Sequence, residues 1–141
     1  MAEIVRDRID AGALAAAAAR HDCGAIAQFQ GTTRDHHEGR RVLRLEYEAY
    51  DRMAQEVLDH IEREACTMFD VATCGIVVRL GVVPPGEASV VITVAAAHHV
   101  HDDARRGRRL AHASRSMRSS TSCAMRSYAS YSSLSTRRPS W

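Results

Sequence analysis

Four side chains that could bind an anion, two arginines and two histidines, lie close together in one polar segment of the chain. Gly31 and Gly39 bound the segment, which carries or adjoins Arg34, His36, His37 and Arg40. A guanidinium group can hold phosphate or carboxylate through two parallel hydrogen bonds, and histidine changes charge near neutral pH. The segment therefore indicates an anion-binding loop. The alternative is an ordinary solvated loop in which Arg34 forms an ion pair with Asp35 or Glu38.

The elements on either side of this loop read as strands. Residues 25–29 form a short apolar run before it. After it, apolar and charged residues alternate over residues 43–50 (Leu43, Leu45, Tyr47 and Ala49 against Arg44, Glu46 and Glu48). This alternation predicts a half-buried strand with one apolar face. A loop held between two strands is a common place for binding residues.

Two helices are expected from caps and apolar spacing. Asp10 can cap a helix through Arg20 that is rich in alanine, with Gly24 placed to end it. Asp51 can cap a second helix. Its apolar residues follow at steps of four, with two more beside them, and we expect all of them in the core: Met53, Val57, Ile61, Ala65, Phe69, Leu58 and Met68.

The remaining elements complete an α+β domain. Residues 75–80 predict a strand, Pro84-Pro85-Gly86 a turn, and residues 88–97 a longer strand that is apolar enough to be buried on both faces. Helices and strands mix with at least one hairpin. We therefore expect one domain with a mixed or antiparallel sheet and packed helices.

The order of these motifs resembles the large (catalytic) subunit of molybdopterin synthase. The resemblance rests on Gly-x-x-Arg-Asp-His-x-x-Gly from Gly31 to Gly39, the strand LEYEAY, the amphipathic helix after Tyr50, Arg79-Leu80-Gly81, the Pro-Gly-Glu turn and the strand ending in Ala97-His98. It covers residues 1–103.

This resemblance implies a function in molybdenum cofactor biosynthesis. In that family, sulfur passes from the C-terminal Gly-Gly thiocarboxylate of a small ubiquitin-like subunit to precursor Z (cyclic pyranopterin monophosphate), giving molybdopterin. The enzyme is a sulfurtransferase that needs no cofactor of its own. The family pairs two large subunits and docks a small subunit at each outer end, so a homodimer within a heterotetramer is implied.

The resemblance also implies a set of substrate-binding residues. Arg34 matches the loop arginine and would hold the substrate phosphate or the thiocarboxylate. Thr32 and Thr33 occupy the adjacent positions. His98 matches the family's histidine, and His99 stands where the family has arginine.

The expected catalytic groups are missing. The family's catalytic lysines lie in a C-terminal segment, and this chain contains no lysine. The catalytic residues are therefore unknown, and we expect turnover to be impaired. The alternative is a non-catalytic binding or scaffold protein that keeps the dimeric fold.

The charge distribution separates the last third of the chain from the rest. Residues 1–103 hold ten arginines against seventeen Asp and Glu residues, a formal charge of −7, whereas residues 104–141 hold nine arginines and no acid. Eleven serines follow residue 113. Such a composition favours a disordered tail.

Two explanations for this tail remain open. One is a reading-frame shift near residues 100–110, because in a GC-rich gene residues 114–121 read two nucleotides over would give a helix-like sequence. The other is a genuine basic tail that binds nucleic acid or an acidic partner. We rank it lower because the tail lacks the aromatic and glycine interleaving of known RNA-binding segments.

Composition sets three further expectations. No apolar run could span a membrane, the alanine-rich start is unlike a signal peptide, and four cysteines without CxxC pairing are typical of reduced thiols in the cytoplasm. The run His98-His99-x-His101-Asp102-Asp103, with His36 and His37, could suggest a metal site. It matches no ligand signature, so we expect no metal.

Overall fold

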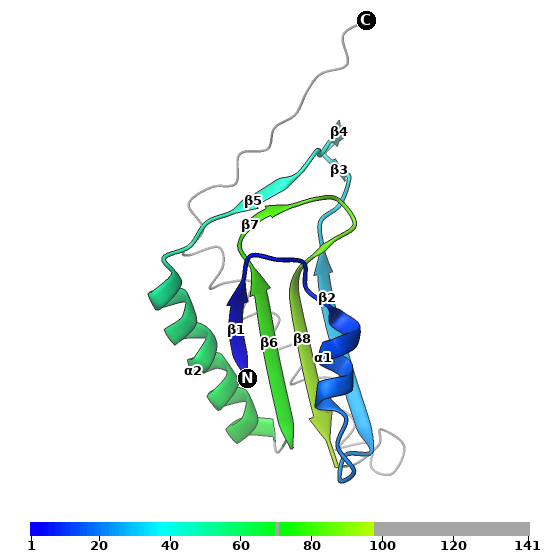
Figure 1. Cartoon of the computed structure of the whole chain (residues 1–141), viewed down its shortest axis with the longest axis vertical. Coiled ribbons are helices and arrows are strands. Elements are labelled where there is room, and N and C mark those ends of the chain that lie inside the picture. The colour runs from blue at the N-terminus through cyan, green and yellow to red at the C-terminus, as the bar shows by residue number, and fades with distance from the viewer. Residues whose placement is uncertain (70, 98–141) are drawn as a thin grey trace, which may run out of the picture.

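A mixed four-stranded sheet lies at the centre of the protein. The structure is a computed structural model that describes residues 1–69 and 71–97 (Figure 1). The strand order is β1-β6-β8-β2. Strand β1 runs parallel to β6, and the other neighbours pair antiparallel. The bounds of these strands are Ala2–Val5 for β1, Thr73–Arg79 for β6, Ala88–Ala96 for β8 and Ala25–Thr32 for β2.

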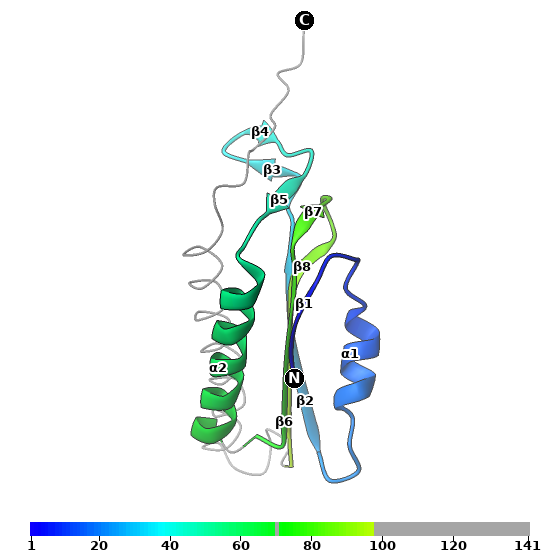
Figure 2. The ribbon, with the colours of Figure 1, turned by 60° about the vertical axis from the view of Figure 1, so that its left-hand side comes forward.

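One helix packs on each face of this sheet, as Figure 2 shows. Helix α2 (Asp51–Phe69) covers β1 and β6, and helix α1 (Ala11–Ala18) lies on the opposite face against β8, β2 and β6. Side chains alternate between the two faces along β6, so Ile76 and Val78 pack with α2 whereas Val77 packs with Ile9. The two-sided burial expected for the last strand is confirmed, since seven consecutive residues of β8 are buried.

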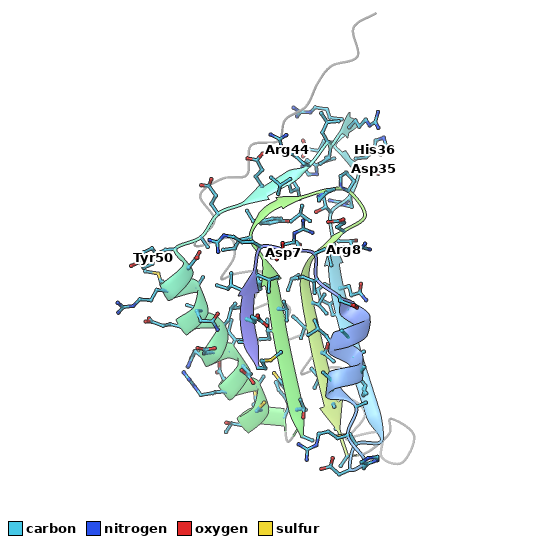
Figure 3. All side chains as sticks on the ribbon, viewed as in Figure 1. Asp7, Arg8, Asp35, His36, Arg44 and Tyr50 are labelled. Atoms are coloured by element: carbon cyan, nitrogen blue, oxygen red, sulfur yellow. The ribbon has the colours of Figure 1, made fainter. Side chains whose placement is uncertain are left out.

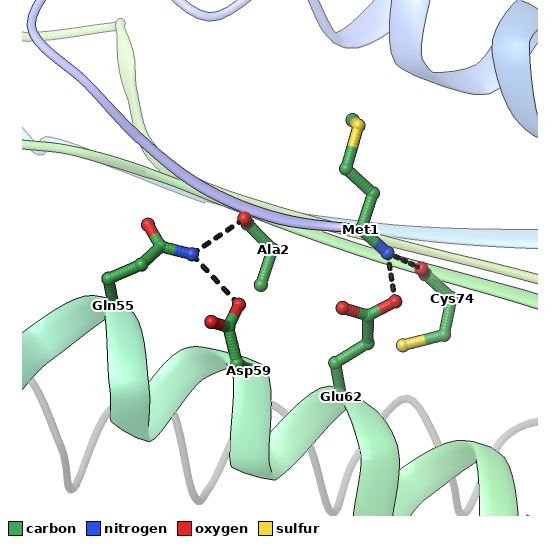
Figure 4. A network of polar contacts seen from close by, with 6 residues as sticks. All are labelled: Met1, Ala2, Gln55, Asp59, Glu62 and Cys74. Atoms are coloured by element: carbon green, nitrogen blue, oxygen red, sulfur yellow. Dashed lines mark hydrogen bonds and ion pairs between the residues drawn. The ribbon is translucent and has the colours of Figure 1, made fainter.

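Polar contacts fasten α2 to the start of the chain (Figure 4). The Gln55 side chain donates to the carbonyl of Ala2 at 2.8 Å and to Asp59 at 2.9 Å. The amino group of Met1 donates to the carbonyl of Cys74 at 2.7 Å and contacts Glu62. These contacts tie the middle of the helix, at Gln55 and Glu62, to the start of the chain.

Two small ribbons lie beyond the end of the main sheet (Figure 1). Strand β5 (Leu45–Tyr47) pairs with β7 (Gly81–Val83), and β3 (His36–His37) pairs with β4 (Arg40–Arg41). The β3–β4 hairpin turns through Glu38 and Gly39, with φ of 49° and 74°. A two-residue hairpin turn with positive φ at both positions fits the right-handed twist of the strands.

The α+β class and the mixed sheet are confirmed, and the structure corrects several boundaries. Asp10 caps α1 as expected, because its carboxylate accepts from the Ala13 N–H at 2.9 Å. The helix ends at Ala18 instead of Arg20, since Ala19 is already extended. Gly24 does not end it. The Gly24 N–H instead bonds to the carbonyls of Ala96 and Ala97, at the start of β2.

The apolar stripe of α2 is only partly core. Leu58, Ile61, Ala65 and Phe69 are buried, whereas Met53 and Met68 are 41% and 59% exposed. Positions four apart drift by about 40° around a helix with 3.6 residues per turn. Met53 lies two such steps before the buried Ile61, so the accumulated drift turns Met53 away from the sheet. Met68 lies at the end of the helix.

The strand expected over residues 43–50 is shorter than predicted. It covers only Leu45–Tyr47, because its partner β7 is three residues long, and Leu43 is 43% exposed. The segment read as a loop also contains the β3–β4 hairpin.

Some expectations fall outside the described residues. They concern the boundary between residues 103 and 104, the tail of residues 104–141, and His98 and His99. In the described part of the chain, no helix is both long and apolar enough to cross a membrane.

Candidate functional site

The end of β2 leads directly into the polar segment. Gly31 pairs with Val90, and the register then slips so that Thr32 pairs with Ala88. The irregularity bends the strand end, as bulges next to functional sites commonly do. Thr33 and Arg34 follow immediately.

Thr33 is clamped by a turn from a distant part of the sequence. Its backbone N–H donates to the carbonyl of Glu87 at 3.0 Å, and its own carbonyl accepts from the Gly86 N–H at 2.8 Å. Gly86 has φ of 85°, which favours glycine. Both backbone groups of Thr33 are therefore fixed by the Pro84-Pro85-Gly86-Glu87 turn.

Arg79 anchors that turn to the sheet. Its guanidinium donates to the Glu87 carboxylate at 2.5 Å and to the carbonyl of Val82 at 2.9 Å. The side chains of Arg79 and Glu87 are 11% and 27% exposed. Partial burial strengthens such a charge-assisted contact relative to a surface ion pair. These bonds give Arg79 a structural role at the end of β6.

Arg34 is exposed and has no hydrogen bond or ion pair with another described residue. The two acids that could have paired with it have other partners. Asp35 pairs with His36 at 2.9 Å, and Glu38 lies 3.7 Å from His37 and 3.8 Å from Arg40. Within the part of the chain that the structure describes, the positive charge of Arg34 is thus available to a ligand.

The contact with His36 also lowers the pKa of Asp35. The hydrogen bond from the His36 ring, together with its electrostatic attraction, holds the pKa of the Asp35 carboxyl below its usual value. Figure 3 shows Asp35 and His36 next to each other in the upper part of the view, near the β3–β4 hairpin. Asp35 therefore remains an anion that engages His36, which leaves Arg34 unneutralised.

The two threonines before Arg34 differ in their surroundings. Thr32 is exposed and lines an open groove of about 450 Å³ between the segment before α1 and the Pro84–Glu87 turn, with Arg8, Asp10 and Gln30. Thr33 is only 3% exposed, and its hydroxyl has no hydrogen-bond partner among residues 1–69 and 71–97. Buried polar atoms usually find a partner, so this hydroxyl is a polar group that the fold itself does not use.

An exposed guanidinium that has no partner among the described residues can bind an oxyanion through paired hydrogen bonds. This guanidinium belongs to Arg34, which directly follows the fixed backbone of Thr33. No group of three or more His, Cys, Asp or Glu side chains in residues 1–69 and 71–97 is placed to bind a metal.

Comparison with known proteins identifies the family. Residues 4–104 match the sequence model of the MoaE protein family. This chain belongs to the MoaE family. The match includes every element described above except β1's first residues, and it ends near the point where the charge distribution of the sequence changes.

Curated relatives named molybdopterin synthase catalytic subunit match part of this chain, and two of them show the extent of the match. The one from Culex quinquefasciatus is 44% identical over 93 residues, covering 65% of this chain and 59% of the relative. The one from Homo sapiens is 45% identical over 76 residues, covering 54% of this chain and 40% of the relative. This MoaE-family chain thus matches only 59% and 40% of the lengths of these two relatives.

A solved structure supports the fold. The chain superposes on molybdopterin synthase from Staphylococcus aureus with a TM-score of 0.74 and 25% identity, over 84% of this chain and 81% of that one. The mixed sheet with a helix on each face is therefore the MoaE fold.

Of the five substrate-binding residues expected from the sequence, three lie in the described part of the chain. Thr32, Thr33 and Arg34 are contiguous at the end of β2, whereas His98 and His99 lie outside the described residues. Sequence reasoning missed Glu87 as a neighbour of this site. It recognised the Pro-Gly-Glu motif as a turn, but no local signal shows that the turn pairs with Thr33, 54 residues earlier.

Proposed function

We propose that this chain acts in molybdenum cofactor biosynthesis as a large subunit of the molybdopterin synthase kind. It would bind precursor Z and the thiocarboxylated C-terminus of a small ubiquitin-like sulfur-carrier subunit. The observation that carries the proposal is Arg34, an exposed cation without a partner among the described residues, on a backbone fixed through Thr33. Membership of the MoaE family and the similarity to molybdopterin synthase catalytic subunits support the proposal.

Both ligands carry the charge that Arg34 can hold. The substrate has a phosphate group and the carrier ends in a thiocarboxylate, and a guanidinium can hold either oxyanion through paired hydrogen bonds. The Thr32 and Thr33 hydroxyls would add neutral donors beside it. His98 and His99 complete the proposed binding set by their place in the family pattern.

Turnover by this chain is proposed to be low. The sulfur transfer of the family uses lysine, and the sequence contains none. Arginine does not replace a lysine amine in proton transfer or as a nucleophile, because its guanidinium stays protonated at any workable pH. The chain would then bind its ligands in the cytoplasm, as a homodimer within a heterotetramer, without efficient chemistry.

The test separates binding from chemistry. The full chain is mixed with precursor Z and saturating thiocarboxylated small subunit; binding is measured by calorimetry and molybdopterin by its fluorescent oxidation product. We expect binding with little or no product. Failure to bind one or both of the ligands would contradict the proposed function. Turnover equal to that of an intact large subunit would show that the lysines are dispensable.

The second candidate is a non-catalytic scaffold that retains the dimeric fold. The absence of lysine favours it. It predicts that the small subunit binds while precursor Z does not, whereas the first proposal requires both ligands to bind.

A further inference from the structure

We infer that Arg79 is a positioning residue for Arg34: its ion pair with Glu87 fixes the turn that holds Thr33, and thereby the place from which Arg34 reaches an anion. The inference rests on the proposed function for the identity of the ligand. The positional link itself stands on contacts within the chain.

The first step is the anchoring of the turn. Arg79 is the last residue of β6 and makes two bonds in different directions, one to the Glu87 side chain and one to the Val82 carbonyl in β7. Its planar group fits this double contact because the donors have a fixed fork geometry. One side chain thus joins β6, β7 and the turn before β8.

The second step is the transfer from the turn to the polar segment. Glu87 contributes its side chain to Arg79 and its backbone carbonyl to the Thr33 N–H. Gly86, one residue earlier, donates to the Thr33 carbonyl. A shift of the turn therefore moves both hydrogen-bonding partners of the Thr33 backbone.

The third step concerns Arg34 itself. Its side chain makes no polar contact with the rest of the described chain, and residues 35–41 engage one another in the hairpin and its ion pairs. The backbone bonds at Thr33 are consequently the nearest fixed point before Arg34. The opposing interpretation is that Arg79 only stabilises the fold and that its loss affects all functions through general unfolding.

A double-mutant cycle distinguishes these two interpretations. Arg79→Met is made in the parent chain and in Arg34→Ala, and the Kd for precursor Z is measured by calorimetry below the melting temperature of every variant. Coupled residues differ from additivity by measurable amounts. We expect Arg79→Met to weaken binding by about tenfold in the parent and less than about twofold in the Arg34→Ala background. An equal loss in both backgrounds would overturn the inference.

A second measurement needs no ligand. Hydrogen exchange by NMR should be faster at the Thr33 and Gly86 amides in Arg79→Met, with a shifted Arg34 amide signal, while the amides of the β6–β8 pair keep their protection. Unchanged exchange at Thr33 and Gly86 would overturn the positional link. If exchange at these amides is faster in Arg79→Met than in the parent, and the parent does not bind precursor Z, the positional link is supported while the proposed function is not.

A conservative variant guards against a folding failure. Arg79→Lys keeps a positive charge, but an ammonium on a flexible stem does not reproduce the planar fork. Arg79→Lys should show the same faster amide exchange as Arg79→Met, and a loss of affinity for precursor Z between those of the parent and Arg79→Met. An Arg79→Lys chain that matches the parent in both measurements would also overturn the inference.

Discussion

Gly31 faces Val90 across the β2–β8 pair so closely that a methyl group on Gly31 would lie 2.7 Å from Val90 Cγ1. Real carbon contacts are longer, so this close approach requires glycine. It occurs at the last regular pair before the register slips and the chain enters the polar segment. The glycine that bounds the segment in the sequence thus has a packing role in the sheet.

Gly31→Ala should destabilise the fold. Val90 is buried, so its side chain has little room to move, and overpacking of this kind typically costs about 1–3 kcal/mol. Thermal or urea unfolding measures the change. Val90→Ala removes the clashing methyl groups, so the double variant should lose less stability than the sum of the losses in the two single variants. Full additivity would show that the clash is not the cause.

Thr33→Val should leave the free energy of unfolding unchanged or raise it slightly, by up to about 1 kcal/mol, because the buried hydroxyl has no partner among the described residues. The same change should weaken precursor Z binding if the hydroxyl serves the ligand. Thr93→Val is the matched control: Thr93 is equally buried, but its hydroxyl accepts from Gln28 at 3.0 Å, so this change should destabilise. A clear loss of stability in Thr33→Val would contradict the prediction.

Arg34→Ala should weaken precursor Z binding by roughly 1.5–3 kcal/mol, about 10- to 150-fold, the usual value of a charge-assisted contact. Calorimetry measures the affinity. Arg44→Ala is the control, since Arg44 is also exposed but is paired with Glu46 at 2.6 Å, and its removal should leave binding almost unchanged. Equal affinity of Arg34→Ala and the parent would reduce Arg34 to an ordinary loop residue.

Asp35 should titrate at a lower pH than an isolated aspartate, because the His36 ring donates to its carboxylate. His36→Ala should raise the Asp35 pKa toward its usual value, as followed by carboxyl-carbon NMR. Since the folded-state pKa is the depressed one, the stabilisation is present above the unfolded-state pKa and is lost as pH falls through the folded-state value. An unchanged Asp35 titration in His36→Ala would refute the assigned cause.

Cys74 should react slowly with iodoacetamide in the native protein at pH 8. Burial, reinforced by the neighbouring Cys66, raises the pKa of its thiol to about 12, so little thiolate is present. Cys23 is partly exposed and should be modified faster than Cys74. In denaturant the two rates should converge; a Cys74 that reacts as fast as Cys23 in the folded chain would exclude this burial effect.

Local patterns in the sequence were sufficient for several features. Asp10 was predicted as a cap because a short acceptor side chain before a run of alanines satisfies free N–H groups at a helix start. The continuous apolar run that became β8 indicated burial on both faces. The motif around Arg34 indicates an anion-binding loop from the chemistry of arginine and histidine alone, and this stays a prediction.

Other features depend on how the elements meet. The apolar spacing of α2 placed Met53 in the core, but only packing against β1 and β6 shows which side of the helix is covered. The pairing of Asp35 and Glu38 with histidine and Arg40, and not with Arg34, depends on the hairpin geometry. The hydrogen bonds that join Thr33 to Gly86 (whose N–H donates) and to Glu87 (whose carbonyl accepts), and the bond from Arg79 to Glu87, follow from the register in which β2 and β6 pair with β8. Register is set by burial of whole strand faces and by turn geometry, so no residue within the polar segment could by itself indicate what holds Arg34 in place.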